Sequence, residues 1–213
     1  MKKAVIFLNG DPPRKSEIKC EELTDSLKIC ADGAYRYVKK ICVPDVVLGD
    51  FDSIAAEKID KRCRKIRFKP EKDFTDGHLA LQYALDEGAE EIVIYGALGG
   101  RPDMAYANLS LLYQAKTGGA KAEIRGGGYT VTLENGAFEK SVKKGACVSM
   151  APFFEGAHII STKGLKYPMK NVTLNRLHIS LSVSNVALAD SFAVESEGEL
   201  LLFTENIQRR TDK

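Results

Sequence analysis

The stretch that says most about the architecture is Val46-Val47-Leu48-Gly49-Asp50-Phe51-Asp52-Ser53. Three consecutive apolar residues at its start are typical of a short strand buried on both faces, as in a parallel sheet covered by helices. A glycine ends this run, and two acids spaced two residues apart follow it directly. We therefore expect Asp50 and Asp52 to lie at the carboxyl end of a buried strand.

The sequence around this stretch alternates in the same way over the first 128 residues. Short apolar runs alternate with segments in which apolar residues recur at helical spacing. This alternation predicts an α/β domain with a mostly parallel sheet covered on both sides. The expected strands are 4–8, 27–31, 46–48, 65–69, 91–95 and 122–125, and the expected helices are 16–26, 35–40, 55–61, 76–87 and 103–116.

From residue 129 onward the pattern changes to short β-rich runs without convincing helical spacing. Asn135-Gly136 lies between two such runs and predicts a hairpin, and Glu197-Gly198 predicts a second turn. We therefore divide the chain into an α/β domain, residues 1–128, and a smaller all-β, sandwich-like domain, residues 129–213. The expected strands of this second domain are 129–133, 137–142, 147–151, 158–161, 178–184, 191–194 and 200–203.

The composition excludes several classes of protein. Hydrophobic residues make up 44% of the 213 residues and charged residues 28%, so the chain is too apolar for a disordered protein. Because 31 lysines and arginines balance 29 acids, the net charge is only +2 and does not favour a nucleic-acid partner. No apolar run approaches the roughly 18 residues of a membrane helix, so we expect no membrane partner.

The cysteines and histidines form no recognisable metal or disulfide pattern. The five cysteines are odd in number and include no C-x-x-C pair, which argues against a disulfide framework and a zinc ribbon. The three histidines lie far apart in the chain, which argues against zinc. Free thiols fit a reducing cytosol, so we expect a cytoplasmic protein whose chemistry depends on carboxylates.

Further acids follow other predicted strands of the α/β domain, namely Asp32, Asp73, Asp76 and Asp103. The carboxyl ends of parallel strands meet at one edge of the sheet, where open α/β sheets bind their ligands. Carboxylates gathered there repel one another unless a cation holds them, and Mg²⁺ prefers such oxygen ligands together with substrate phosphates. The alternative is that these residues only form turns and cap helices.

A glycine-rich segment after strand 91–95 reads Gly96-Ala97-Leu98-Gly99-Gly100-Arg101-Pro102-Asp103. Its backbone N–H groups predict an anion site at the start of a helix, with Arg101 as a phosphate clamp. A plain strand-to-helix turn would explain the glycines but not the arginine. Neither the P-loop nor the G-x-G-x-x-G pattern is present, which argues against P-loop NTPases and ordinary dinucleotide dehydrogenases.

Taken together, in order and spacing, these motifs resemble the thiamin pyrophosphokinase family. The matching segments are 31–34, 44–53, 72–76 and 99–103 with Asn108, and in the second domain 164–168 and 184–185. The resemblance implies an N-terminal α/β nucleotide domain, a C-terminal β domain and a homodimer with clefts between its subunits. It also implies transfer of pyrophosphate from ATP to the hydroxyl of thiamin, with AMP as the second product.

The resemblance also implies a role for each matched residue. The Mg²⁺ ligands and catalytic acids would be Asp50, Asp52 and Asp76. The nucleotide and phosphate site would contain Asp32, Asp73, Gly99, Gly100, Arg101, Asp103 and Asn108. The thiamin pocket would contain Tyr167, Ser184 and Asn185.

Three positions depart from the family pattern. Met104 replaces a histidine, Val186 replaces a glutamate, and Val183 replaces a glycine. Met104 and Val186 leave open a divergent homologue that binds thiamin or a nucleotide without turnover. A second alternative is a HAD-type phosphatase, because Asp50-Phe51-Asp52 after an apolar strand also resembles an aspartyl-phosphate motif. That motif normally lies on the first strand, however, and here the motif follows the third.

Overall fold

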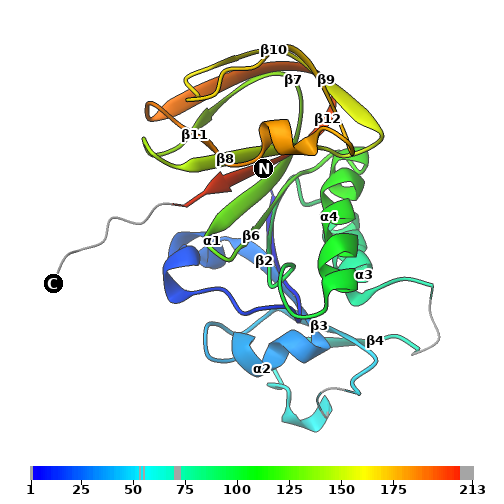
Figure 1. Ribbon diagram of the computed structural model, residues 1–213. Coiled ribbons are helices and arrows are strands. Elements are labelled where there is room, and N and C mark those ends of the chain that lie inside the picture. Colours follow the sequence, from blue (N-terminus) through cyan, green and yellow to red (C-terminus); the bar gives the residue numbers. More distant parts are fainter. Residues whose placement is uncertain (1, 53, 55, 70–72, 207–213) are drawn as a thin grey trace, which may run out of the picture. The chain divides into compact units, whose positions relative to one another are not determined.

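The structure is a computed structural model and describes residues 2–52, 54, 56–69 and 73–206. The chain divides into two compact units, Met1–Gly127 and Gly128–Lys213 (Figure 1). No helix in the described part of the chain is long and apolar enough to cross a membrane.

The first unit contains a parallel sheet with the strands β1 Lys3–Phe7, β2 Ser26–Ala31, β3 Val46–Gly49, β4 Arg64–Arg67, β5 Glu91–Tyr95 and β6 Lys121–Gly126. Their order in the sheet is β6-β5-β1-β2-β3-β4. The chain adds β2, β3 and β4 on one side of β1 and then returns to place β5 on the other side. The strand order therefore changes direction between β1 and β5, and this is the position where ligands usually bind to such sheets.

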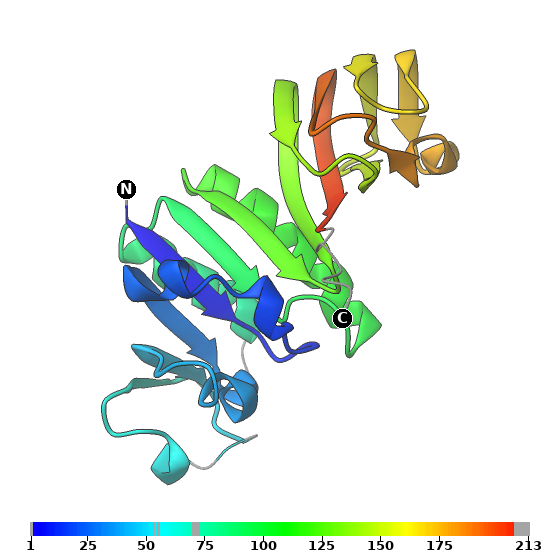
Figure 2. The same ribbon diagram turned by 90° about the vertical axis from the view of Figure 1, so that its left-hand side faces the viewer.

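Helices cover both faces of this sheet (Figure 2). They are η1 Lys15–Glu17, α1 Cys20–Thr24, η2 Asp32–Ala34, α2 Tyr35–Val38, η3 Ala56–Lys58, α3 Asp76–Asp86 and α4 Pro102–Thr117. Helices α3 and α4 pack together on one face, where Gly77 approaches Leu8 and Leu111. The alternating α/β architecture predicted from the sequence is confirmed.

The predicted helix 16–26 is wrong, because the chain forms two short pieces there, η1 and α1. Between them the backbone of Ile18 is extended, with φ −91° and ψ 121°. The carbonyl of Glu17 accepts a hydrogen bond of 3.0 Å from the hydroxyl of Tyr95. This tertiary contact takes the place of a helical hydrogen bond and interrupts the helix.

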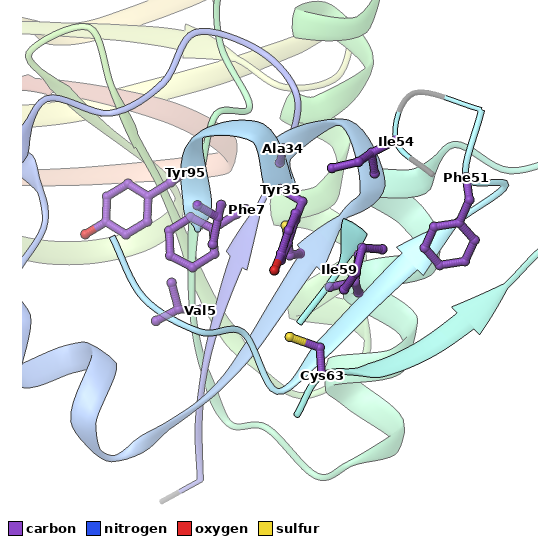
Figure 3. Close-up of a cluster of buried hydrophobic side chains, with 12 residues drawn as sticks. Val5, Phe7, Ala34, Tyr35, Phe51, Ile54, Ile59, Cys63 and Tyr95 are labelled. Carbon is purple, nitrogen blue, oxygen red and sulfur yellow. The ribbon is translucent and has the colours of Figure 1, made fainter. Parts of the chain in front are cut away.

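The opposite face of the sheet carries a hydrophobic cluster that supports the loops at the carboxyl edge (Figure 3). Phe7 stacks on Tyr95 with ring centroids 5.7 Å apart. The hydroxyl of Tyr35 accepts a hydrogen bond of 2.9 Å from the backbone N–H of Asp60. Phe51 belongs to the same cluster, so packing in this core fixes the turn that carries Asp50 and Asp52.

A buried ionic network joins α1 to the strands β5 and β6. The guanidinium of Arg125 donates to both carboxylate oxygens of Glu22, at 2.6 and 3.0 Å, and also to Glu123. The same guanidinium lies 3.2 Å from the hydroxyl of Tyr95. Because Arg125 is only 9% exposed, its charge depends on these partners for compensation.

The second unit is antiparallel and surrounds its own core. Its strands are β7 Tyr129–Ser141, β8 Cys147–Pro152, β9 Gly156–Lys163, β10 Lys170–Asn175, β11 Asn185–Val186 and β12 Ser191–Glu205. Strand β12 pairs with β7 along its length, while its first half also pairs with β9 and its second half with β8. The predicted β-rich second domain is confirmed.

The predicted hairpin at Asn135-Gly136 is wrong. Strand β7 runs straight through these residues, and β12 likewise runs through the turn predicted at Glu197-Gly198. Residues Ser196 and Leu200 of β12 pair with Gly136 and Glu134 of β7, so the register shifts at this point. Gly136 has φ 76° and Gly198 has φ 90°. These left-handed glycines therefore lie at an irregularity within two long strands, and the chain does not reverse its direction there.

The predicted strand 178–184 is also wrong, because these residues contain the 3₁₀ helix η4 Ile179–Ser182. The side-chain oxygen of Asn175 accepts the backbone N–H groups of Leu177 and His178, both at 3.0 Å, and so turns the chain after β10. Ser182 then donates a hydrogen bond of 2.7 Å to the carbonyl of Met150. The sequence pattern does not predict strand β10.

Candidate active site

Three carboxylates from two neighbouring strand ends meet at the carboxyl edge of the parallel sheet. Asp32 follows β2, and Asp50 and Asp52 follow β3, whose residue Leu48 pairs with Ala31 of β2. One oxygen atom from each carboxylate lies within 4.8 Å of the other two. The structure therefore brings together these three predicted site residues, at a spacing that a divalent cation can bridge.

Asp32 is the buried member of this group. It is only 3% exposed, and its Oδ2 atom has no hydrogen-bond partner among the described residues. Burial raises the pKa of Asp32, the charges of Asp76, Asp50 and Asp52 raise it further, and a hydrogen bond from the Phe51 N–H opposes the shift. A buried, unpartnered carboxylate oxygen among other acids fits a cation, which would supply the missing partner.

The turn after β3 aims its two acids by an unusual backbone conformation. Phe51 has φ 61°, a left-handed conformation that costs energy for a bulky residue. Its side chain is buried, and the guanidinium of Arg67 lies 5.5 Å from the ring centroid. The backbone N–H of Asp52 donates a hydrogen bond of 3.1 Å to Asp50 Oδ1. Ser53, the last residue of this motif, lies outside the described residues.

The start of α3 brings a fourth acid to the group. Thr75 caps this helix, because its Oγ1 accepts a hydrogen bond of 3.2 Å from the backbone N–H of His78. Asp76 is the first helical residue, and its charge acts on Asp32. Asp73 is exposed, and Lys72 lies outside the described residues. Capping therefore uses Thr75 and does not account for the two predicted acids.

The glycine-rich loop after β5 lies beside the loop after β1. The N–H of Gly10 donates to the carbonyl of Gly96 at 2.8 Å, and the N–H of Asp11 donates to the carbonyl of Leu98 at 2.9 Å. Gly99 and Gly100 are left-handed, with φ 77° and 65°. A Cβ on Gly99 would lie 2.1 Å from Asp11 Oδ2, so only glycine fits there.

Arg101, the predicted phosphate clamp, forms an ion pair with Asp103 of the same chain. The guanidinium of Arg101 forms two hydrogen bonds to Asp103, from Nε to Oδ1 at 3.1 Å and from Nη2 to Oδ2 at 2.6 Å. This contact lowers the pKa of Asp103 and raises that of Arg101. Both side chains are exposed, by 76% and 64%, and exposed ion pairs are weak. A phosphate group could therefore compete with Asp103 for the guanidinium.

Asn108 has a supporting position. It is 6% exposed, and its Nδ2 atom donates a hydrogen bond of 2.8 Å to the carbonyl of Ala97. A Cβ on Gly77 would lie 3.1 Å from its Oδ1 atom. The side chain therefore joins the glycine-rich loop to α4 and packs against α3.

The three predicted thiamin residues lie together in the second unit. Asn185 is buried and accepts hydrogen bonds from the N–H groups of Tyr167 and Val186 at 3.0 and 2.9 Å, and it donates to the Tyr167 carbonyl at 2.7 Å. Tyr167 itself is 56% exposed, with Lys166 Nζ 5.3 Å from its ring centroid. Ser184 is left-handed, with φ 59°, and its N–H donates to Ser149 Oγ at 2.9 Å. Asn185 thus supports an exposed tyrosine.

Two further polar residues lie at the carboxyl edge of the parallel sheet, although neither is among the predicted site residues. Asn9 and Asp11 follow β1 in the same way that Asp32 follows β2. In the sequence they mark the end of an apolar run, and the position after a strand is the signal that could have identified them. The side chain of Asn9 lies on Gly33, and that of Asp11 lies on Gly99.

Comparison with known proteins relates both units to one family. Residues 22–124 match the family model of the thiamin pyrophosphokinase catalytic domain, and residues 137–201 match that of the thiamin pyrophosphokinase vitamin B1 binding domain. The chain belongs to the thiamin pyrophosphokinase family. It is accordingly an enzyme and a transferase, and this membership decides against the HAD-type phosphatase.

Individual members of this family resemble the chain over most of its length. Thiamine pyrophosphokinase of Bacillus subtilis is 33% identical over 150 residues, which are 67% of this chain and 69% of that protein. Thiamin pyrophosphokinase 1 of Caenorhabditis elegans is 28% identical over 218 residues, or 94% and 88% of the two chains. The crystal structure of the Bacillus subtilis protein superposes with a TM-score of 0.80 at 25% identity, covering 97% of this chain and 100% of that one.

Proposed function

We propose that the chain transfers pyrophosphate from ATP to the hydroxyl of thiamin and so produces thiamin diphosphate and AMP. The observation that supports this most directly is the group of three carboxylates, Asp32, Asp50 and Asp52, within 4.8 Å of one another. These residues belong to the part of the chain that matches the catalytic domain of the family. A relative that matches 94% of this chain is named thiamin pyrophosphokinase 1.

Magnesium is the cation that this group suits best. Mg²⁺ takes oxygen ligands and is commonly held by one or two carboxylates together with the substrate phosphates. Asp50, Asp52 and Asp76 would hold it, and Asp32 would contribute its otherwise unpartnered Oδ2 atom from the buried side. When bound, Mg²⁺ supplies positive charge to the phosphate oxygens, which offsets the repulsion between the carboxylates and the nucleotide.

The glycine-rich loop would hold the end of the phosphate chain that is distant from the acids. Gly99 and Gly100 bring backbone N–H groups to this loop without side chains in the way. Arg101 would exchange Asp103 for phosphate oxygens, which accept the planar guanidinium in the same two-pronged manner. Asp73 would lie at the edge of this nucleotide site, and Asn108 would keep the loop in place.

The transfer itself needs alignment and charge neutralisation more than covalent catalysis. The thiamin hydroxyl oxygen bonds to the β-phosphorus while the bond from that phosphorus to the oxygen of the α-phosphate breaks. AMP leaves with the electron pair of the broken bond. One of the carboxylates of Asp32, Asp50, Asp52 and Asp76, which form the acid group, takes the hydroxyl proton from within hydrogen-bond reach.

The second unit would bind thiamin, and it would also form a homodimer. Tyr167 offers an exposed aromatic face, which suits an organic cation. Ser184 and Asn185 would complete this pocket. Exposed apolar side chains of the same unit, such as Leu177, Leu181 and Leu188, support self-association. All five cysteines are unpaired, which supports a reducing, cytoplasmic environment.

The test is to incubate the protein with ATP, Mg²⁺ and thiamin and to separate the nucleotides and thiamin phosphates. AMP and thiamin diphosphate should appear in equal amounts. Formation of ADP with thiamin monophosphate would refute pyrophosphoryl transfer. Binding of both substrates without AMP would instead indicate the divergent homologue that Met104 and Val186 leave open. Sedimentation analysis of the same preparation tests the homodimer.

A further inference from the structure

Asn9 lies at the centre of the carboxyl edge of the parallel sheet. Phe7 of β1 pairs with Cys30 of β2 on one side and with Tyr95 of β5 on the other. Asn9 lies two residues after Phe7. Continuing the strand register by two residues therefore places Asn9 beside Asp32, after β2, and beside Ala97 of the glycine-rich loop, after β5. This is the position at which the strand order of the sheet changes direction.

The backbone on both sides of Asn9 is held in place. The hydroxyl of Tyr37 donates a hydrogen bond of 2.9 Å to the carbonyl of Leu8, the preceding residue. On the other side, the N–H of Gly10 donates to Gly96, and a Cβ on Gly10 would lie only 2.5 Å from the Gly96 carbonyl oxygen. Asn9 is therefore presented from a fixed backbone, as a binding residue needs to be.

The amide of Asn9 rests on a position where a side chain is excluded. A Cβ on Gly33 would lie 2.4 Å from Asn9 Nδ2 and 2.6 Å from Asn9 Cγ. Gly33 does not have a left-handed φ, so its backbone conformation does not require glycine. Residue 33 must be glycine because the side-chain amide of Asn9 occupies the space that a Cβ would need. Within the described residues this amide is exposed and has no hydrogen-bond partner.

We propose that the Asn9 side chain binds ATP by donating a hydrogen bond from Nδ2 to an oxygen of the phosphate chain. The proposal rests on the proposed function, because it places the phosphate chain between the acid group and the glycine-rich loop. An amide suits this position because it donates a hydrogen bond without a charge. A lysine there would pair with Asp32, and an aspartate would repel the nucleotide.

The first test compares Asn9→Ala with the wild-type protein. Loss of one hydrogen bond to a charged phosphate should raise the KM for ATP about tenfold or more. The KM for thiamin should change less than about twofold, and the Tm should stay the same because the amide contacts no other polar group. Asn9→Asp should raise the KM for ATP further, since it adds a negative charge.

The second test uses Gly33, because the three atoms nearest to a Cβ at this position all belong to the Asn9 side chain. Gly33→Ala should displace the amide and raise the KM for ATP in the wild-type background, but have little further effect in the Asn9→Ala background. Gly126→Ala is the matched control, because a Cβ there meets nothing within 4 Å and the φ of Gly126 is not left-handed. It should leave both KM values unchanged.

Three results would overturn the role of Asn9. They are an unchanged KM for ATP in Asn9→Ala, an equal rise in both KM values, and fully additive effects of Asn9→Ala and Gly33→Ala. Calorimetric binding of ATP with Mg²⁺ alone, compared between wild type and Asn9→Ala, decides the question even if no thiamin diphosphate forms. Failure of the proposed function is thus distinguishable from failure of this inference.

Discussion

The side chain of Asp32 occupies the space beside Gly49 that any other residue would need for its Cβ. A Cβ on Gly49 would lie 2.8 Å from Asp32 Cβ and 3.2 Å from Asp32 Oδ2. The ends of β2 and β3 can therefore approach closely enough for Asp32 to join Asp50 and Asp52. The glycine of the motif thus assembles the acid group and does more than end a strand.

The metal-binding role that we propose for the turn after β3 predicts the effect of removing its charges. Asp50→Asn and Asp52→Asn should each lower turnover by about 10²–10³-fold, because each removes one charged ligand while keeping the shape of the side chain. Steady-state turnover at several Mg²⁺ concentrations measures the effect. The matched control is Asp25→Asn, which changes an exposed acid before β2, at the opposite edge of the sheet. Near wild-type turnover in either single variant would contradict the assignment.

The raised pKa of Asp32 predicts how stability depends on pH. Below the unfolded-state pKa of about 3.9, the Asp32 carboxyl is protonated in the folded and in the unfolded chain, so its ionisation does not lower the free energy of unfolding. As the pH rises through its higher folded-state pKa, ionisation of Asp32 destabilises the folded chain. Asp32→Asn should therefore raise the Tm at pH 7 without divalent cations, and the gain should vanish toward about pH 4. Thermal melts across this range provide the measurement, and a lower Tm for the variant at pH 7 would contradict it.

The contact between Arg101 and Asp103 predicts two effects of opposite direction. Arg101→Lys should raise the KM for ATP about tenfold, because a lysine cannot offer two parallel donors to phosphate oxygens. Asp103→Asn should lower the KM for ATP, because the guanidinium then binds phosphate without first leaving a carboxylate. Neither substitution should change the Tm, since the pair is exposed. A higher KM for ATP in Asp103→Asn would show that this carboxylate positions the guanidinium instead of competing with phosphate.

The exposed ring of Tyr167 predicts a selective loss of thiamin binding. Tyr167→Ala should raise the KM for thiamin more than the KM for ATP and leave the Tm unchanged, because 56% of the residue is already exposed. Tyr167→Phe should retain most of the affinity. Asn185→Ala should raise the KM for thiamin and also lower the stability by about 1–3 kcal/mol, since it leaves part-buried backbone groups of Tyr167 and Val186 without their partner. Equal rises in both KM values for Tyr167→Ala, with a lower Tm, would indicate a structural tyrosine.

The network around Arg125 predicts an effect on stability. Arg125→Met should lower the free energy of unfolding by about 3–5 kcal/mol, because it removes the buried cation that pairs with both Glu22 and Glu123. Denaturant titration followed by circular dichroism measures this loss. Lys19→Met is the control, since Lys19 is 65% exposed and contacts Glu22 from the solvent side at 3.5 Å. A similar loss in both variants would rule out a special role for the buried arginine.

Local patterns in the sequence were enough for most of the first unit. The apolar runs around Val46–Gly49 and Glu91–Tyr95 identify buried strands because burial on both faces demands consecutive apolar residues. The helix Asp76–Asp86 is predictable from its spacing and its cap. Short-range signals failed at Asn135-Gly136, because the pairing of β7 with β12 over a long stretch outweighs a two-residue turn preference.

The order of strands and strand-end acids along the chain is therefore enough to place Asp32, Asp50, Asp52 and Asp76 at one edge, because parallel strands share their carboxyl ends. Contacts between residues far apart in the sequence are decided only when the chain folds. They include the pairing of Tyr167 with Asn185, the position of Asn9 on Gly33 and that of Asp32 beside Gly49. The physical reason is that hydrophobic periodicity records burial, whereas the partner of a polar atom depends on distances that only packing fixes.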